Sequence, residues 1–182
     1  YNKDRKFQGV GTFYFRGGAI KEKGAYQNGK LHGDGCEEYR EGGGLRYTGG
    51  YERGKRNGLG ISYYENGNKE YEGCFKEDKC HDDAGTEYKE DGTLHYKGAF
   101  QKGNWEGIGA RYYEDGSVLF TGEFREGRRY KGQEFRRDGI LRYEGLYRDG
   151  QYEGEGNYFG REGELKWEGD FIDGLIDCDG GK

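Results

Sequence analysis

Aromatic residues and glycines alternate with polar or small residues in short stretches along this chain. In residues 71–75 the positions of Tyr71, Gly73 and Phe75 fall two apart, so a strand places them on one face and Glu72 and Cys74 on the other. The run Gly-Ile-Gly-Ala-Arg-Tyr-Tyr at residues 107–113 is typical of the second strand that follows each such stretch. No segment shows the apolar stripe of an amphipathic helix. The pattern predicts an antiparallel meander of β-hairpins.

Asn-Gly and Asp-Gly pairs separate the predicted strands. One set connects the second strand of a hairpin to the first strand of the next, and it comprises Asn66-Gly67, Asp91-Gly92, Asp115-Gly116 and Asp138-Gly139. A second set marks the opposite ends of hairpins, and it comprises Asn28-Gly29, Asp149-Gly150 and Asp173-Gly174. We interpret both sets as tight hairpin turns, because the favoured turn needs positive φ at both central residues.

The alternating phrase recurs at a fixed period. Its central glycine stands at Gly24, Gly49, Gly73, Gly98, Gly122, Gly145 and Gly169, a step of 23 to 25 residues. Such a period is typical of a stacked repeat array, in which the binding site is a surface summed over repeats. We predict an all-β fold, a single elongated, twisted antiparallel sheet in which residues 1–182 form one array of about eight hairpins. The start at Tyr1 in mid-phrase and the absence of Met indicate a fragment of a longer protein.

The composition is poor in aliphatic residues and rich in rings. Leu, Ile, Val and Phe make up about 15% of the chain, below the level of roughly 20% at which disorder is expected. Aromatic residues nevertheless make up 16%, in phase with the repeat. We therefore expect stability to come from rings laid across neighbouring repeats. The glycine between the two rings of a strand leaves a gap, into which we expect a neighbouring ring to pack against bare backbone.

Charge and cysteine usage indicate a soluble compartment without a nucleic-acid partner. The net charge is -5 and both signs alternate finely, so no field for nucleic acid is expected. Residues 1–23 carry six Lys/Arg against two acids and residues 149–182 carry ten acids against three bases, which is either solvated surface or a head-to-tail contact between molecules. The four cysteines lack disulfide spacing and no apolar stretch approaches about 18 residues. We expect a cytoplasmic protein, associated with the cytoskeleton or a membrane.

The phrase Tyr-x-Gly-x-Phe/Tyr-x-x-Gly-x-x-x-Gly-x-Gly-x-x-Tyr, as in residues 47–63 and 96–112, resembles the MORN (membrane occupation and recognition nexus) repeat. The resemblance covers nearly the whole chain. It implies a solenoid-like antiparallel sheet with an aromatic-lined groove. It also implies a role as a cytoskeletal scaffold, a binder of partner peptides or a membrane-junction protein. The chain departs from the pattern at Glu22, where an aromatic residue is expected.

The repeat falters at two places. In the unit that starts at Tyr71, Asp78, Asp82 and Ala84 replace expected glycines, and the unit from Phe120 is one residue short around residues 130–131. We expect a local kink or bulge at both places.

Catalytic and metal chemistry find little support. The Gly-x-x-x-x-Gly steps lack the Lys-Ser/Thr of a phosphate-binding loop, and two serines and three histidines make a nucleophile–base pair improbable. The cluster Cys80, His81, Asp82 and Asp83 consists of adjacent residues, whereas a zinc site needs four spaced ligands, so we interpret it as an irregular loop rather than a metal site. We predict no enzyme activity, no catalytic residues, no cofactor and no metal.

Residues 125–142 hold seven Lys/Arg against three acids. These basic residues are Arg125, Arg128, Arg129, Lys131, Arg136, Arg137 and Arg142. They are either a solvated edge that blunts strand-to-strand aggregation or a contact for anionic lipid headgroups. Strand alternation sends Arg136 and Arg137 to opposite faces, which weakens the lipid interpretation.

We predict a non-enzymatic structural and interaction scaffold that binds a partner protein, as a helix or peptide, along the aromatic-lined groove. The predicted floor of the groove comprises Tyr71, Phe75, Tyr96, Phe100, Phe120, Phe124, Tyr143, Tyr147, Trp167 and Phe171. Peripheral binding to anionic phospholipid is one alternative. Self-assembly as a cytoskeletal element or homo-oligomer, through the unprotected edges of an open sheet, is the other.

Overall fold

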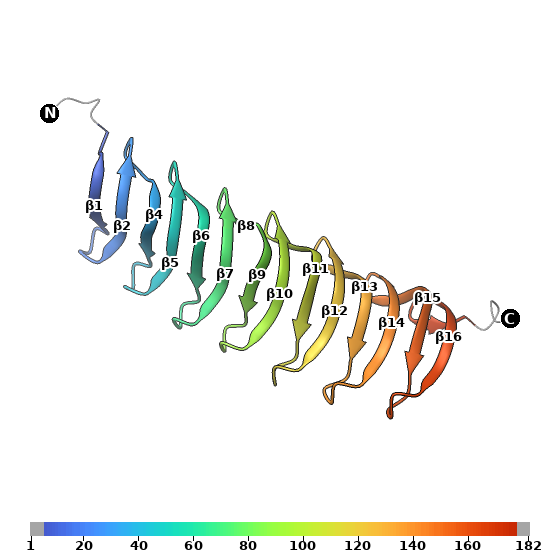
Figure 1. Ribbon diagram of the computed structural model, residues 1–182. Helices are drawn as coiled ribbons and strands as arrows, with labels where there is room; N and C mark the ends of the chain where they lie inside the picture. Colours follow the sequence, from blue (N-terminus) through green and yellow to red (C-terminus); the bar gives the residue numbers. More distant parts are fainter. Residues whose placement is uncertain (1–5, 178–182) are drawn as a thin grey trace. The chain divides into compact units, whose positions relative to one another are not determined.

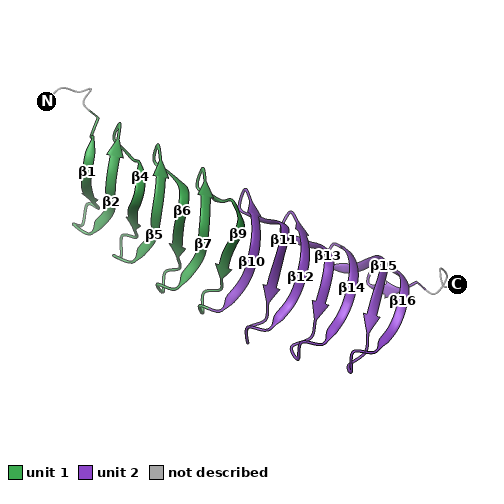
Figure 2. Ribbon diagram, viewed as in Figure 1, with its two compact units in different colours: residues 1–92 green, residues 93–182 purple. Residues whose placement is uncertain are grey.

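The computed structural model describes residues 6–177, and these residues form strands, turns and loops without a helix. No segment among them is therefore a helix that could cross a membrane. The chain divides into two compact units, Tyr1–Gly92 and Thr93–Lys182 (Figure 2). Each unit is a run of consecutive antiparallel hairpins (Figure 1). The predicted all-β fold of the MORN type is confirmed.

Unit 1 holds nine strands. They are β1 (Gly9–Tyr14), β2 (Ile20–Gln27), β3 (Lys30–Leu31), β4 (Gly33–Tyr39), β5 (Leu45–Glu52), β6 (Lys55–Tyr63), β7 (Lys69–Lys76), β8 (Lys79–Cys80) and β9 (Asp82–Tyr88). Unit 2 holds eight strands. They are β10 (Leu94–Gln101), β11 (Asn104–Tyr112), β12 (Val118–Arg125), β13 (Arg128–Phe135), β14 (Leu141–Arg148), β15 (Gln151–Phe159), β16 (Leu165–Ile172) and β17 (Leu175–Ile176).

The two sets of glycine-containing connections differ in geometry. At Asn28-Gly29 both residues have positive φ, 54° and 74°, as the favoured two-residue hairpin turn requires. At Asn66-Gly67 only the glycine has positive φ. The four-residue turn from Tyr64 to Gly67 closes through a hydrogen bond from the Gly67 amide to the Tyr64 carbonyl at 3.1 Å. The interpretation of the set that includes Asn66 as tight turns with two positive φ values is therefore wrong.

The Asn or Asp before these loop glycines has a different role. The Asn66 side-chain oxygen accepts a hydrogen bond from the Asn68 amide at 2.9 Å, and Asp115 and Asp138 accept the amides of Ser117 and Ile140 in the same way. A short polar side chain that bonds its own backbone two residues on forms an Asx turn. These positions thus select Asn or Asp for the side-chain oxygen and not for a left-handed backbone.

Register shifts occur in most of the strand pairs, so a bulge is a regular feature of the repeat. In the β10–β11 pair the register shifts between Gly98 and Phe100. In the β12–β13 pair it shifts between Glu123 and Phe124, and the shift leaves Tyr130 of β13 without an opposite partner. This repeat is therefore one residue shorter because its bulge contains fewer residues. The predicted local bulge at this place is confirmed, and it is smaller than the bulge of the β10–β11 hairpin.

A row of paired glycines crosses each unit. In unit 1, Gly60 of β6 lies opposite Gly49 on one side and Gly73 on the other. In unit 2 the row runs through Gly98, Gly109, Gly122, Gly132, Gly145, Gly156 and Gly169. Because glycine has no side chain, the row is a strip of bare backbone on the sheet.

The first aromatic residue of a repeat lies on this strip, as Tyr47 and Tyr143 show. A Cβ atom added at Gly60 would come within 2.2 Å of the Tyr47 hydroxyl oxygen and 2.5 Å of its ring. The Tyr47 hydroxyl donates a hydrogen bond to the Gly50 carbonyl at 3.1 Å, and Tyr143 donates to Leu146 at 3.0 Å. The gap beside Gly49 is therefore filled by the ring of Tyr47, the residue two positions before it in the same strand.

Neighbouring repeats are instead joined by edge-to-face contacts between rings. The Tyr47 ring meets Tyr51 of its own repeat at 5.4 Å and Phe75 of the next repeat at 5.0 Å, with interplanar angles of 86° and 88°. In unit 2, Tyr143 meets Tyr147 at 5.3 Å and Phe171 at 5.2 Å in the same way. Each contact contributes about 0.5–1.5 kcal/mol beyond the burial of area. The core of unit 2 is thus a continuous herringbone of rings, and in unit 1 the same contacts link Tyr47, Tyr51, Phe75 and Tyr71.

A polar seam joins the repeats at their loop ends. Arg40 donates to the Tyr63 carbonyl and the Tyr64 hydroxyl donates to the Tyr88 carbonyl at 2.9 Å. In unit 2 the Tyr113 hydroxyl donates to Phe135 at 3.0 Å and Arg136 donates to Phe159 at 2.7 Å. In these four places a side chain of one repeat thereby satisfies a strand-end carbonyl of the next one.

We predict that Gly60→Ala destabilises the protein by about 1–3 kcal/mol, because the new methyl group forces the Tyr47 ring off the sheet. Gly44→Ala is the matched control, since a Cβ atom there meets nothing within 4 Å and neither glycine has positive φ. Urea unfolding followed by far-ultraviolet circular dichroism measures both changes. Equal midpoints for the two variants contradict the packing role of the glycine row.

We predict that stability falls steeply between about pH 10 and pH 12. Burial raises the pKa of Tyr47 and of Tyr143 to about 12, whereas an unfolded tyrosine has a pKa of about 10. A raised folded-state pKa gives stability that is complete below the unfolded value and is lost as the pH rises toward the folded value. Thermal melts between pH 7 and 11.5, with tyrosinate absorbance at each step, measure the loss.

The control for this pH dependence is Tyr143→Phe, because Phe120 occupies the corresponding position of its own repeat. The variant loses about 1 kcal/mol at neutral pH with the hydrogen bond to Leu146, and its stability depends less steeply on pH above 10. An unchanged slope shows that ionisation of Tyr143 does not limit stability.

Candidate functional site: the aromatic face

The structure places nine of the ten predicted groove residues in the buried core. Tyr71, Phe75, Tyr96, Phe100, Phe120, Phe124, Tyr143, Tyr147 and Phe171 are all buried. Trp167 is partly exposed. Within each unit these rings lie on one face and contact one another. They build the floor as packed rings, and their role in binding a partner stays a prediction.

A second set of planar side chains covers these buried rings and lies at the surface of the aromatic face. We call it the covering layer, and it comprises Arg56, Trp105, Arg129 and Tyr152. The Trp105 ring stacks on Tyr96 at 4.5 Å and 9°, and the Tyr152 ring stacks on Tyr143 at 3.8 Å and 11°. Since all four residues are only partly exposed, one side of each packs on a core ring and the rest reaches solvent.

The other two members of the covering layer, Arg56 and Arg129, place a guanidinium group over a ring. Arg56 lies 4.6 Å from the Tyr47 ring centroid, and Arg129 lies 4.6 Å from Tyr147 and 5.7 Å from Phe120. Arginine over an aromatic face gains cation–π energy and keeps hydrogen-bond donors for other partners. The covering layer therefore offers both π faces and positive charge.

Sequence reasoning missed the covering layer, although a signal for it exists. Each member stands two residues after a turn glycine, at Gly54, Gly103, Gly127 and Gly150. The same position holds Leu31 after Gly29. Because the residue type varies between Arg, Trp, Tyr and Leu, the position does not show as a conserved letter of the repeat.

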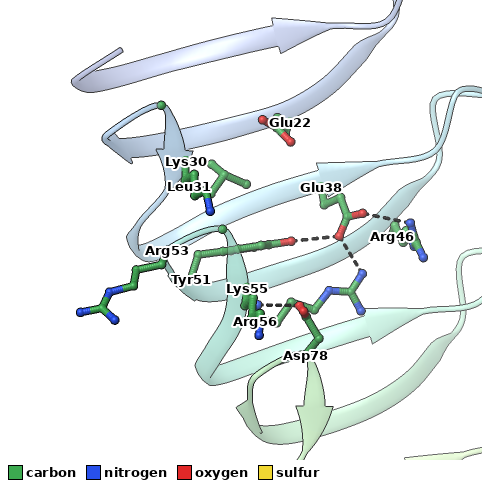
Figure 3. Close-up of a pocket in the computed structure, with 12 residues that line it drawn as sticks. Glu22, Lys30, Leu31, Glu38, Arg46, Tyr51, Arg53, Lys55, Arg56 and Asp78 are labelled. Carbon is green, nitrogen blue, oxygen red and sulfur yellow. Dashed lines mark hydrogen bonds and ion pairs between the residues drawn. The ribbon is translucent and has the colours of Figure 1, made fainter. Parts of the chain in front are cut away.

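A carboxylate cluster fixes the covering layer in unit 1. Glu38 accepts hydrogen bonds from Arg56 at 2.7 Å, from the Tyr51 hydroxyl at 2.9 Å and from Arg46 at 3.0 Å (Figure 3). Burial opposes ionisation of Glu38, but the hydrogen bond and charge of Arg56 hold its pKa below the ordinary value. Burial and the Glu38 charge raise the pKa of Tyr51, so that the phenol stays a donor.

Unit 2 repeats this cluster around Glu134, which is 6% exposed. Glu134 accepts hydrogen bonds from Arg129 at 2.6 Å, from the Tyr147 hydroxyl at 3.1 Å and from Arg142 at 3.2 Å. Burial, followed by the charge of Glu134, raises the pKa of Tyr147. A buried carboxylate with three donors is satisfied, and its guanidinium partners are held in place.

The carboxylates also explain which repeats use Tyr as their second ring. Tyr51 and Tyr147 donate to Glu38 and Glu134, and Tyr26 donates to Glu22 at 3.2 Å. The corresponding residues elsewhere are Phe75, Phe100, Phe124 and Phe171. Glu22, which departs from the repeat pattern, is thus the hydrogen-bond acceptor for the hydroxyl of its own repeat.

Clefts open between the members of the covering layer. In unit 1 a cleft of about 660 Å³ is lined by Leu31, Tyr51, Arg56 and the Glu38 cluster, and Arg53 points away from it (Figure 3). In unit 2 a cleft of about 250 Å³ lies between Trp105 and Arg129, and one of about 270 Å³ lies between Arg129 and Tyr152. These are open surface clefts with rings and guanidinium groups in their walls, and they suit side chains of a partner rather than a buried reaction.

The basic segment at residues 125–142 is largely paired within the protein. Arg128 pairs with Asp149, Arg137 with Asp115 and Arg125 with Glu123, while Arg129 and Arg142 bind Glu134. Arg136 donates to the Leu141 and Phe159 carbonyls. Lys131 is exposed on β13. Pairing reduces the positive charge that this segment offers to a membrane, and its lipid contact stays a prediction.

The Cys80–Asp83 cluster has a structural role at Asp82. The Asp82 carboxylate accepts the Cys74 amide at 2.6 Å and the Ala84 amide at 3.0 Å, at the break between β8 and β9. Within residues 6–177 no three His, Cys, Asp or Glu side chains form a group that could hold a metal ion. The carboxylate here serves the backbone of an irregular repeat.

The comparison with family models identifies the repeat. The model described as MORN repeat matches residues 23–44, 47–69, 71–81, 96–118 and 143–164, which together are more than half of the chain. The third match ends just before Asp82, and the short unit from Phe120 is left unmatched. A search of curated proteins gave no match. The chain belongs to the MORN-repeat family.

Proposed function

We propose that this protein is a non-enzymatic scaffold that binds a partner protein along the aromatic face of its repeats. MORN-repeat proteins are generally non-enzymatic scaffolds, and MORN repeats generally mediate protein or membrane-lipid interactions. The observation that supports a protein partner is the covering layer. Partly exposed Trp, Tyr and Arg side chains on a rigid floor are the residue types that dominate protein interfaces.

The predicted groove residues take an indirect part in this proposal. Their rings are buried, so a partner touches the covering layer while the groove residues hold that layer in position. Preorganised side chains lose little entropy on binding, which favours affinity. We also propose that all eight repeats serve one scaffold in the cytoplasm, which suits the free thiols of Cys36, Cys74 and Cys80.

We predict that the double variant Trp105→Leu/Tyr152→Leu loses at least tenfold in affinity for a captured partner. Leucine fits the covering position, as Leu31 shows in unit 1, so the fold is retained while the π faces are removed. The measurement is affinity capture and cross-linking from a native extract, followed by titration of the purified partner. The melting temperature of the variant is measured alongside.

Ile108→Ser is the control on the same strand as Trp105. Ile108 is 70% exposed, so its replacement costs little stability. Unchanged binding by the leucine double variant, together with loss of binding in Ile108→Ser, moves the site away from the covering layer and overturns the proposal.

A further inference from the structure

The two clefts beside Arg129 on the aromatic face of unit 2 are lined by more arginines than acids, although the chain as a whole carries -5. The cleft between Trp105 and Arg129 is lined by three arginines and one acid, Asp149. The cleft between Arg129 and Tyr152 is lined by two arginines and one acid, Glu134. A third cleft in this unit, of about 450 Å³, has Glu144, Glu155 and Glu168 in its lining and no cation. These clefts of unit 2 thus differ in charge, and the two beside the covering layer favour anions.

Each of the two clefts beside Arg129 combines a ring with a fixed guanidinium. Trp105 provides the ring in one cleft and Tyr152 in the other. Arg129 donates to buried Glu134 at 2.6 Å and to the Gly150 carbonyl at 3.5 Å, and a guanidinium carries five donors, more than these two bonds use. A glutamate side chain matches such a wall, because its methylene groups pack on the ring and its carboxylate reaches the guanidinium.

The spacing of the clefts favours a helix. Trp105, Arg129 and Tyr152 lie on β11, β13 and β15, so the two clefts are one repeat apart, which is two strand spacings or about 9.5 Å. Residues seven apart on a helix are about 10.5 Å apart along its axis and lie on nearly the same side. Residues three apart on an extended strand span a similar distance but point to opposite faces.

We propose that unit 2 binds an acidic helical segment of its partner, which inserts glutamate or aspartate side chains seven residues apart into the two clefts beside Arg129. The inference rests on the proposed scaffold function and names the chemistry of the partner. The covering layer supplies the contact area, and the arginines in the clefts select carboxylates.

The test uses two synthetic probes and the intact chain. Both probes are fluorescent alanine-based peptides of 21 residues with three glutamates, spaced seven residues apart in one and five apart in the other. The heptad peptide is expected to bind at least tenfold more tightly by fluorescence anisotropy, and its binding weakens as salt rises. Equal binding of the two peptides overturns the proposed spacing.

The variant Arg128→Glu is expected to weaken the heptad peptide at least tenfold, because Arg128 lines the first cleft. Its ion pair with Asp149 is exposed, with side-chain exposures of 69% and 75%, so the fold loses little stability. Arg137→Glu is the matched control, since Arg137 forms an exposed pair with Asp115 and lines neither cleft. Equal losses in the two variants show attraction by overall charge and overturn the proposal.

Two further arms separate the remaining outcomes. Vesicles containing about 30% phosphatidylserine are added as competitors, and their displacement of the heptad peptide in an Arg128-dependent way assigns the clefts to lipid headgroups instead. If neither peptide binds while the Trp105→Leu/Tyr152→Leu variant still loses its captured partner, the acidic-helix proposal is wrong and the scaffold function stands. If both experiments are negative, both proposals fall.

Discussion

The contact on which the rest of this structure depends is that of a tyrosine or phenylalanine ring with a pair of glycines on adjacent strands. The Tyr47 ring can lie flat over Gly49 and Gly60 only because neither residue has a Cβ atom. Once the ring lies there, it can make edge-to-face contacts with the second ring of its own repeat and with the second ring of the next repeat. Tyr47 makes these two contacts with Tyr51 and Phe75. A chain with few aliphatic residues thereby obtains a core, since each ring buries as much area as one or two aliphatic side chains.

The surface chemistry follows from that core. A ring lying flat on the sheet leaves its outer face uncovered, and a planar side chain two residues after the turn glycine covers it. Flat groups stack well on flat groups, so Trp, Tyr and Arg all suit the position. The carboxylates Glu38 and Glu134 then fix the arginines among them. The repeat therefore supplies the platform, and residues outside its consensus supply the chemical differences between positions.

The sequence was sufficient to predict the architecture and insufficient to predict the surface. Period, strand alternation and turn glycines are local features, and they predicted the hairpins and the ring positions correctly. The same local features could not tell which rings are buried in the core, such as Tyr71 and Phe75, and which lie at the surface, such as Trp105 and Tyr152. Burial depends on which ring lies beneath the other, and that order is set by contacts between strands. The Asn66-Gly67 loop was misinterpreted for a similar reason, because Asn favours both a positive φ and an Asx turn.

The separation of charge within unit 2 also depends on the strand period. Alternation sends successive side chains to opposite faces, so a chain that mixes acids and bases finely along its sequence can still have faces of different charge. On β13, Arg129 and Glu134 both turn toward the aromatic face although they are five residues apart, because the bulge at Tyr130 changes the phase between them. A repeat without that bulge would place one of them on the opposite face. The bulge therefore brings a buried carboxylate within hydrogen-bond distance of the guanidinium that separates the two clefts.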